Sequence, residues 1–555
     1  MIRGEKPAIL PYMEQTKKTS FVKGAAILAA AGLLCKVLGV LFRIFAVRII
    51  GESGMFYYEK IYPIYSWLLI ISSSGIPTAI SRMVAERASL GNYDGARRVL
   101  YRALLLLVGI GLVTTAFMFF GAEWIGTQML GMDAYSKYAL MALAPSLFFV
   151  SILCALRGYL QGLQRMTGTS VSQIAEQVFK ILFGLALANF FFQKYAGTPY
   201  CYAAGAAGVL LGVTVSEILA LLVMAIFCAG AGRLPRMAKP AVKTTDPILR
   251  RILALAIPIT LGASILPIAN VLDSMMITEL LESIGYSKEL AQVNYVALCT
   301  YVRSVINLPA SLTVALSMSL VPAIAAARAK QDTLSVQRVS LLGLKLAMAV
   351  GLPCAVGLSV LARPIIQLLY SSITPKSLSI AESLMQVAAF TVVFISLVQT
   401  ATGALQGVGK HRLPVYFLLI GGVTKVVVNL VCIRIPSINI FGAVYSNLAC
   451  FGIAGILDTI ALLVVTKAKL SVVDTFLKPI LASATMGCLA YSTYQLLRMI
   501  PFFDSRILTR SIATVIAVLV GVAAYAVLML ALHMFTKEEL QYIPGGRKLA
   551  RFARK

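Results

Sequence analysis

The stretch GYLQGLQR at residues 158–165 recurs as GALQGVGK at residues 403–410, an offset of 245 residues. The same offset relates two further pairs: Pro77 with Pro322, and Lys180 with Lys425. One such match would carry little weight, but three separate regions at one offset indicate an internal duplication. The chain is therefore expected to consist of two related halves.

The composition around these copies is too apolar for a protein dissolved in water. Of the 555 residues, 59% are hydrophobic and 13% are charged, whereas soluble domains are about 45–50% apolar and about 25% charged. The net charge of +27 would suggest nucleic acid in a soluble protein, but cytoplasmic loops of membrane proteins collect Lys and Arg. We expect no nucleic-acid partner. The nine cysteines form no CxxC pair and the two histidines lie far apart, so no metal site is expected.

Fourteen runs are long enough to cross about 30 Å of hydrocarbon. They span residues 24–49, 56–80, 100–121, 136–161, 171–193, 202–228, 251–278, 294–326, 337–361, 381–406, 413–435, 440–466, 477–498 and 508–534. Six helices separate the two copies of the repeat, so the halves have parallel topology. We predict an all-α polytopic membrane protein with about fourteen transmembrane helices, made of two pseudo-symmetric six-helix lobes and a C-terminal helix pair.

The predicted boundaries are a basic tail at 1–20, an N-lobe at 21–235, a C-lobe at 236–470, a helix pair at 471–536 and a second basic tail at 537–555. With the N-terminus inside, about 31 Lys and Arg residues fall in cytoplasmic segments and about 11 on the outer side. This is a strong positive-inside bias. Both termini are therefore predicted to be cytoplasmic.

Charged residues within the predicted spans require a structural or functional explanation, because each costs about 2.5–3.5 kcal/mol at the bilayer centre. Lys36 and Arg43 are seven residues apart and share one face of the first helix. Two like charges on one face favour a cationic cavity wall. The alternative is that Arg43 and Arg48 reach the outer interface while Lys36 is paired.

Two buried lysines have different expected partners. Glu176 precedes Lys180 by four residues, the favourable order for an intrahelical ion pair. Lys425 has Gly421 in that place, so it must find an acid on another helix. We expect this acid to be Asp273, with Asn429 one turn further along and lining the same pocket.

The remaining intramembrane charges divide by sign. Arg303 opens the second half and is expected to face a cavity, whereas Lys345 is close enough to the inner boundary to reach it. Glu217 and Asp458 lie on the closing helices of the two halves; they couple an ion or pair with buried lysines, and both interpretations stay open. The surplus of cations favours an anionic substrate such as a phosphate or pyrophosphate head group.

Several stretches carry a resemblance to a known family. They are LCKVLG at 34–39 followed by Arg43, Ala46, Arg48 and Gly51; YPIY at 62–65; GIPTAIS at 75–81; LRGYLQG at 156–162; SQIAEQ at 172–177; and KVVVN at 425–429. In this order they resemble the MurJ-type flippases. They resemble more closely the stage V sporulation protein B-like polysaccharide exporters of the multidrug/oligosaccharidyl-lipid/polysaccharide (MOP) superfamily. The likeness covers roughly residues 20–535.

The resemblance implies fourteen helices, two lobes, a central cationic cavity and a lipid-linked sugar substrate such as lipid II. In the MurJ type, arginines on helices 1, 2 and 8 face the cavity. Lys36 and Arg303 match such positions approximately, and Arg43 falls one place away, while Trp67 and Leu68 stand near the place of the second-helix arginine. Members with a sodium site build it from helices 7, 11 and 12, which implies Asp273, Asn429 and Asp458 here, with Lys425 as a substitute for the ion.

We therefore predict a flippase of a bacterial plasma membrane, with Gram-positive origin expected from the resemblance. It would move a polyprenyl-pyrophosphate-linked saccharide outward by alternating access, driven by the membrane potential or by a Na⁺ or H⁺ gradient, for cell-wall or sporulation polysaccharide. No cofactor is expected. The expected partners are membrane lipids, the lipid-linked oligosaccharide and cell-wall synthesis proteins. The candidate substrate-binding residues are Lys36, Arg43, Lys180, Arg303 and Lys425, and the candidate ion-coupling residues are Glu217, Asp273, Asn429 and Asp458.

Two other functions are weighed against this one. A cation-coupled multidrug antiporter of the MATE type shares the two-lobe plan, but it would stop at twelve helices and line its pocket with acids. A membrane polysaccharide polymerase or ligase would need a long external loop with catalytic acids or bases. The external loops here are short, so we do not expect an enzyme.

Overall fold

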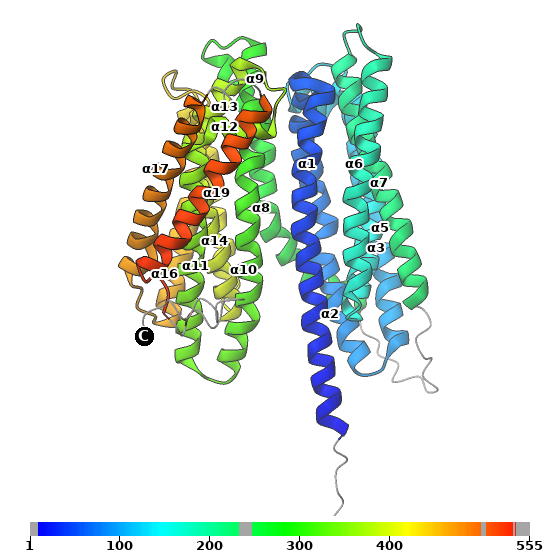
Figure 1. Ribbon diagram of the computed structural model, residues 1–555. Helices are drawn as coiled ribbons and strands as arrows, with labels where there is room; N and C mark the ends of the chain where they lie inside the picture. Colours follow the sequence, from blue (N-terminus) through cyan, green and yellow to red (C-terminus); the bar gives the residue numbers. More distant parts are fainter. Residues whose placement is uncertain (1–8, 232–246, 501–506, 537–538, 540–555) are drawn as a thin grey trace, which may run out of the picture. The chain divides into compact units, whose positions relative to one another are not determined.

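The computed structural model describes residues 9–231, 247–500, 507–536 and 539, and every regular element in this part of the chain is helical (Figure 1). The helices are α1 (Ile9–Ser73), α2 (Gly75–Ser89), α3 (Tyr93–Phe120), α4 (Ala122–Trp124), α5 (Ser136–Gly162), α6 (Met166–Lys194), α7 (Cys201–Ala231), α8 (Ile248–Ser283), α9 (Lys288–Val296), α10 (Arg303–Ala329), α11 (Thr333–Val360), α12 (Ala362–Leu369), α13 (Pro375–Ala388), α14 (Thr391–Gly407), α15 (Arg412–Cys432), α16 (Phe441–Thr466), α17 (Lys478–Met499) and α19 (Ile507–Ala531). Short π-helical turns lie at Ile125–Met129, Ala297–Val302 and Val473–Leu477.

The length and composition of these helices identify a multi-pass membrane protein. Ten of them are long and apolar enough to cross a membrane, or eleven if α13 and α14, which are bent by 44° at their junction, form one span. Many of their large apolar side chains are exposed, among them Leu105, Leu261 and Val464. The prediction of an all-α polytopic membrane protein is confirmed. The count of fourteen helices stays a prediction.

The long first helix contains a break where the sequence predicted a loop. Gly51 has φ 66° and ψ −177°, a backbone conformation that only glycine adopts readily. It falls between the predicted spans 24–49 and 56–80. The second of these spans is itself divided, because α1 ends at Ser73 and α2 begins at Gly75, where glycine lets the chain approach the backbone of Ala256.

Corresponding helices begin with the same kind of cap. The Asn92 side chain accepts a hydrogen bond from the Gly95 amide at 2.8 Å, at the start of α3. The Asp332 side chain accepts one from the Ser335 amide at 2.9 Å, at the start of α11. These side chains satisfy amides that the first helical turn leaves unpaired. Both helices therefore start where the sequence places a short polar residue.

The chain forms two compact units, residues 1–271 and residues 272–555, divided within α8. In the first unit the repeat glycines of α5 pack against α2: a Cβ atom on Gly158 would lie 2.8 Å from the carbonyl oxygen of Pro77. In the second unit a Cβ atom on Gly407 would lie 3.0 Å from the carbonyl oxygen of Val321 in α10. Small residues at four-residue spacing allow such close helix crossings in membranes. The repeated glycine pattern therefore fixes one helix contact in each unit.

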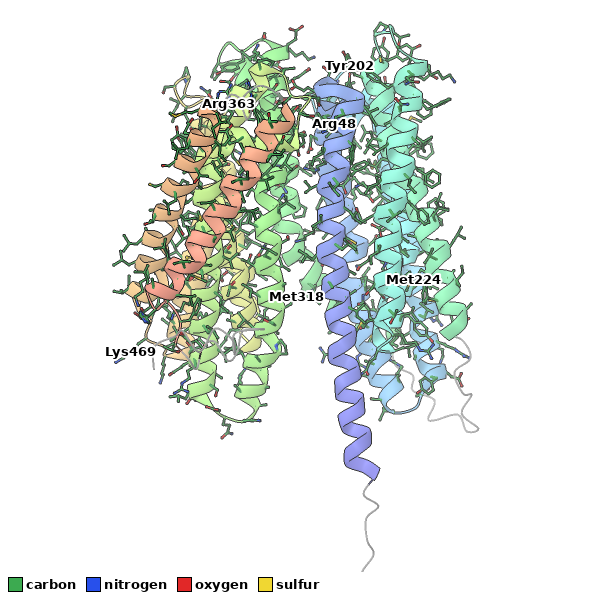
Figure 2. The ribbon with its side chains drawn as sticks, in the orientation of Figure 1. Arg48, Tyr202, Met224, Met318, Arg363 and Lys469 are labelled. Atoms are coloured by element: carbon green, nitrogen blue, oxygen red, sulfur yellow. The ribbon has the colours of Figure 1, made fainter. Side chains whose placement is uncertain are left out.

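The C-terminal helices α17 and α19 pack on each other, and α17 packs on α11. The Tyr525 hydroxyl donates a hydrogen bond to the Ala349 carbonyl oxygen at 2.9 Å, which ties α19 to α11. Figure 2 shows Arg363 and Lys469 at opposite ends of this second unit. In the first unit, Arg48 and Tyr202 lie toward one end and Met224 toward the other (Figure 2).

Candidate functional site

Four residues from three helices meet at one carboxylate inside the second unit. The Lys425 Nζ atom of α15 lies 2.7 Å from Asp273 Oδ2, and Arg303 Nη2 at the start of α10 lies 3.2 Å from the same oxygen. Asn429 Nδ2, one turn along α15 from Lys425, donates a hydrogen bond of 2.7 Å to Asp273 Oδ1. We call these four residues the Asp273 cluster. Its carboxylate joins α8, α10 and α15.

The Asp273 cluster is buried and carries an excess of positive charge. Asp273 and Lys425 are each 2% exposed, so their mutual attraction offsets a large desolvation cost. Two cations share one carboxylate, which leaves a formal charge of +1. The Arg303 side chain is 25% exposed, so the surplus charge lies at the accessible edge of the cluster.

The prediction that Lys425 pairs with Asp273 beside Asn429 is confirmed. Asp458, which the family resemblance grouped with them, lies elsewhere on α16. The carboxylate of Asp458 accepts a hydrogen bond of 3.0 Å from Thr402 of α14 and is 1% exposed.

In the first unit, Arg43 pairs with an acid on the far side of the Gly51 break. Arg43 Nη1 lies 3.4 Å from Glu59 Oε1, and the guanidinium is 6.0 Å from the centre of the Tyr58 ring. The Arg43 side chain remains 21% exposed. Lys36, two turns earlier on α1, is exposed and forms no ion pair or hydrogen bond with any residue that the structure describes.

The predicted ion pair between Glu176 and Lys180 is wrong. Glu176 pairs instead with Arg157 of α5, whose Nη2 atom lies 2.8 Å from Glu176 Oε2. The Lys180 Nζ atom lies 5.0 Å from the ring centres of both Phe42 and Tyr62. Arg157 Nη2 also donates a hydrogen bond of 2.9 Å to the Ser172 hydroxyl of α6, and aromatic faces stabilise the lysine in its place.

Glu217 of α7 is also buried, and its Oε2 atom has no hydrogen-bond partner in the part of the chain that the structure describes. The charges of Glu176, Arg157 and Lys180 act on it. Glu217 therefore belongs to the charged interior of the first unit.

Lys345, which the sequence analysis expects close to the inner boundary, is buried and paired with an acid. Its side chain is 8% exposed and its Nζ atom lies 2.9 Å from Glu539 Oε2. The ammonium also lies 5.1 Å from the ring centre of Phe535. The segment after α19 therefore covers this lysine.

The sequence analysis missed the aromatic surroundings of Lys180 and the partner of Arg43. Tyr58 and Tyr62 are one turn apart and stack with ring centres 5.1 Å apart. Their four-residue spacing, together with Glu59, was the available signal. Lys60, which was also overlooked, is 1% exposed and donates a 2.9 Å hydrogen bond to the Leu130 carbonyl oxygen.

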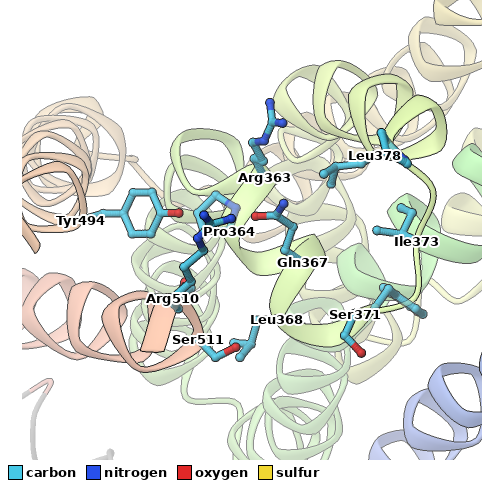
Figure 3. Close-up of a pocket in the computed structure, with 13 residues that line it drawn as sticks. Arg363, Pro364, Gln367, Leu368, Ser371, Ile373, Leu378, Tyr494, Arg510 and Ser511 are labelled. Atoms are coloured by element: carbon cyan, nitrogen blue, oxygen red, sulfur yellow. The ribbon is translucent and has the colours of Figure 1, made fainter. Parts of the chain in front are cut away.

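A separate pocket of about 240 Å³, with both polar and apolar lining residues, lies in the second unit between α12, α13, α17 and α19 (Figure 3). Figure 3 shows Arg510 of α19 extending beside Tyr494 and Pro364, with Arg363 on α12. None of the predicted substrate-binding or ion-coupling residues lines this pocket. It is therefore distinct from the Asp273 cluster.

The helices define the class of protein, which is a multi-pass membrane protein. The family model described as polysaccharide biosynthesis protein matches residues 21–328, more than half of the chain. The chain belongs to this polysaccharide biosynthesis protein family. The MatE family model matches residues 258–431.

Among curated proteins, the chain is 25% identical to stage V sporulation protein B of Bacillus subtilis over 531 residues, covering 95% of this chain and 98% of that protein. It is 23% identical to the lipid II flippase MurJ of Bacillus subtilis over 430 residues, covering 75% and 78%. Among solved structures, the lipid II flippase MurJ in an inward closed conformation superposes with a TM-score of 0.68 at 17% identity, covering 92% and 99%. The last likeness shows that the fold is shared.

Proposed function

We propose that this protein is a flippase that moves an anionic polyprenyl-pyrophosphate-linked saccharide, such as lipid II, from the inner to the outer leaflet. The surplus positive charge of the Asp273 cluster at Arg303 carries the proposal. A site intended only for stability would pair one cation with the carboxylate, because an extra charge at bilayer depth is costly. A pyrophosphate group carries the negative charge that this cationic cluster attracts.

Lys36, Arg43 and Arg303 are the proposed contacts to the head group. All three retain exposure: Lys36 is exposed, and the side chains of Arg43 and Arg303 are 21% and 25% exposed. Lys180 and Lys425 are buried, so in this conformation they act on the substrate through their electric field. A water-accessible cationic cavity is part of the proposal.

The proposed topology has fourteen spans and cytoplasmic termini. The two arms of α1 on either side of Gly51, together with α17, bring the eleven candidate spans to fourteen. The distribution of Lys and Arg between alternate loops supports this orientation. The proposed location is the plasma membrane of a Gram-positive bacterium, in line with the Bacillus subtilis relatives.

Transport is proposed to follow alternating access. The head group enters an inward-open cavity, the polyprenyl tail stays in the bilayer, and a change of conformation exposes the head group outside. An inside-negative potential favours outward movement of an anion by about 2.3 kcal/mol per charge per 100 mV. The same field returns the empty cationic cavity inward.

Sodium coupling at Asp273 and Asn429 is not favoured, because the Lys425 ammonium lies 2.7 Å from Asp273 Oδ2. A sodium ion there would be repelled by the lysine and by Arg303. We therefore propose that export continues when sodium is replaced by potassium. Loss of export on that replacement would contradict this reading of the cluster.

The test is the appearance of a labelled lipid-linked precursor in the outer leaflet of proteoliposomes. The Arg303→Gln variant keeps the Lys425–Asp273 pair, and it should weaken substrate affinity about tenfold or more, since a hydrogen bond to a charged group contributes about 1.5–3 kcal/mol. Lys36→Glu should reduce export further by reversing a charge. Arg363→Gln is the matched control, because Arg363 pairs with Glu382 outside the cluster. Equal export by all variants would refute the proposal.

The MatE model match keeps one rival in view, a cation-coupled multidrug antiporter. Such a protein would move a fluorescent organic cation across the same vesicles, and the lipid-linked precursor would stay in its leaflet. A polymerase or ligase would change the mass of the precursor. Our proposal expects the mass to stay the same while the leaflet changes.

A further inference from the structure

Asp458 is a buried carboxylic acid in the middle of α16 that lacks an ionic partner. It is 1% exposed. Its Oδ2 atom accepts one hydrogen bond, from the Thr402 hydroxyl at 3.0 Å. Its Oδ1 atom has no partner in the part of the chain that the structure describes. A carboxylate so poorly solvated takes up a proton rather than remain charged.

The surroundings of Asp458 are closely packed and apolar. One turn before it, Gly455 brings α16 so near α14 that an added Cβ atom would lie 3.3 Å from the Leu397 side chain. One turn after it, Leu462 is fully buried in the same hydrophobic cluster as Ala401 of α14. Gly455, Asp458 and Leu462 lie on one face of the helix. The acid therefore lies in the dry contact between α14 and α16.

The helices that pack on α16 supply no counter-ion within the described residues. Asp458 is the one charged residue of α16, and α14 has none. The charged residues of the other packed helices are Arg338 and Lys345 of α11, Lys376 and Glu382 of α13, and Arg412 and Lys425 of α15. Of these, Lys345 pairs with Glu539, Glu382 with Arg363 and Lys425 with Asp273, while Arg338, Lys376 and Arg412 are exposed. None forms an ion pair with Asp458.

Of the three other acids that are buried in the described part of the chain, Glu59 and Asp273 differ in this respect, since Glu59 pairs with Arg43. Asp273 contacts two cations and an amide. Glu217 has no ion pair among the described residues either, but the charges of Glu176, Arg157 and Lys180 act on it, whereas no such charge acts on Asp458. Asp273 and Asp458 are similarly buried, so their surroundings, and not their depth, separate these two acids.

We propose that Asp458 is a proton-binding site, neutral in this conformation and ionised when α14 and α16 separate and admit water. The acid lies eight residues before the end of α16, about 12 Å along the helix axis, so a modest opening at that end would hydrate it. On uptake, an O–H bond forms at a carboxylate oxygen. On release that bond breaks, the electron pair stays on the carboxylate, and the proton passes to water.

This inference deepens the proposed function, since it assigns the coupling ion as a proton that moves inward while the lipid moves outward. Ionisation of Asp458 would place a new charge between two packed helices and would favour their separation. The protonated acid would favour the closed contact. The proton thereby selects between two arrangements of the second unit.

The first experiment reads protonation directly and needs no substrate. Infrared difference spectra of the purified full-length protein, native minus Asp458→Asn, should show the carbonyl band of an un-ionised carboxylic acid at neutral pH, and the band should vanish at alkaline pH. The Thr402→Val variant should keep the band to higher pH, because the lost hydroxyl stabilised the charged form. Asp474→Asn, which alters an accessible ionised carboxylate, is the matched control without such a band. Absence of the band in the native protein at neutral pH would overturn the proposal.

The second experiment measures coupling in proteoliposomes. An inward proton gradient should accelerate export by the native protein, and Asp458→Asn should export at a rate that no longer responds to the gradient. A response retained in Asp458→Asn would overturn the coupling. If native protein exports no lipid at all, the proposed function fails, whereas the infrared result still decides whether Asp458 holds a proton.

Discussion

The buried ion pair between Asp273 and Lys425 makes a quantitative prediction about stability. Asp273→Asn removes the carboxylate and leaves the Lys425 ammonium 2% exposed without its counter-ion. Removing one partner of a buried pair costs about 3–5 kcal/mol, because the other charge stays in a poorly solvating environment. Lys425→Met should cost less, since Arg303 at 3.2 Å and Asn429 still satisfy the carboxylate.

The double variant Asp273→Asn/Lys425→Met allows the energy of the interaction between the two charges to be separated from the effect of each residue alone. It removes both buried charges, and Arg303 can turn toward water through its exposed side. Its free energy of unfolding should therefore lie within about 1–2 kcal/mol of the native value. The interaction energy from the double-mutant cycle should reach about 2–3 kcal/mol. Denaturant titration of the full-length protein in mixed micelles measures all four values.

The Asp474–Lys478 pair is the control, because its atoms are just as close, 2.6 Å apart. Those two side chains are 38% and 26% exposed, so water screens them and the cycle should give about 0–1 kcal/mol. Burial, not distance, is what distinguishes the two pairs. Equal interaction energies in the two cycles would refute the reasoning.

Three further outcomes follow from described contacts. Gly158→Ala should destabilise the first unit by about 1–3 kcal/mol, because its Cβ would overlap the Pro77 carbonyl. Gly109 has open space around it, so Gly109→Ala should be neutral or stabilising by up to about 1 kcal/mol. Thermal unfolding of the two variants measures both effects, and equal effects would contradict the prediction. Glu539→Gln should lower the free energy of unfolding by about 1–3 kcal/mol, because it leaves Lys345 without its carboxylate. Limited proteolysis should then cut the C-terminal segment faster than in the native protein. An unchanged cleavage rate would argue against the contact. The hydrogen bond from Lys478 holds the pKa of Asp474 below its ordinary value of 3.8. The small stabilisation from this pair is therefore present at neutral pH and is lost as the pH falls below that value. In a pH titration of the free energy of unfolding, Asp474→Asn should lack this loss of stability at low pH.

The sequence predicted those features that depend on one residue and its immediate surroundings. A lysine without an acid on its own helix had to pair across helices, and the scarcity of intramembrane acids pointed to Asp273. The helix break at Gly51 and the glycine pattern of the repeat are local in the same sense. Each follows from the cost of exposing charge or backbone to lipid.

Where a charged residue has two candidate partners, the sequence could not predict which of them forms the ion pair. Glu176 has Lys180 one turn away, yet it pairs with Arg157 of another helix, a choice decided by packing that spacing rules do not contain. Lys345 and Glu539 are separated by 194 residues, and no local pattern brings them together. The position of Lys180 among aromatic rings depends likewise on the fold of α1 after Gly51.

The two lysines at the same offset in the two halves, Lys180 and Lys425, are held by interactions of different kinds. Lys180 lies 5.0 Å from the ring centres of Phe42 and Tyr62, and the broad ring faces tolerate a slide of an ångström or two, whereas the close contact between the Lys425 ammonium and its carboxylate at 2.7 Å is broken by the same shift. Homologous points in the two units therefore differ in mechanical compliance. Under an equal load, we expect the N-terminal unit to yield smoothly and the C-terminal unit to switch abruptly.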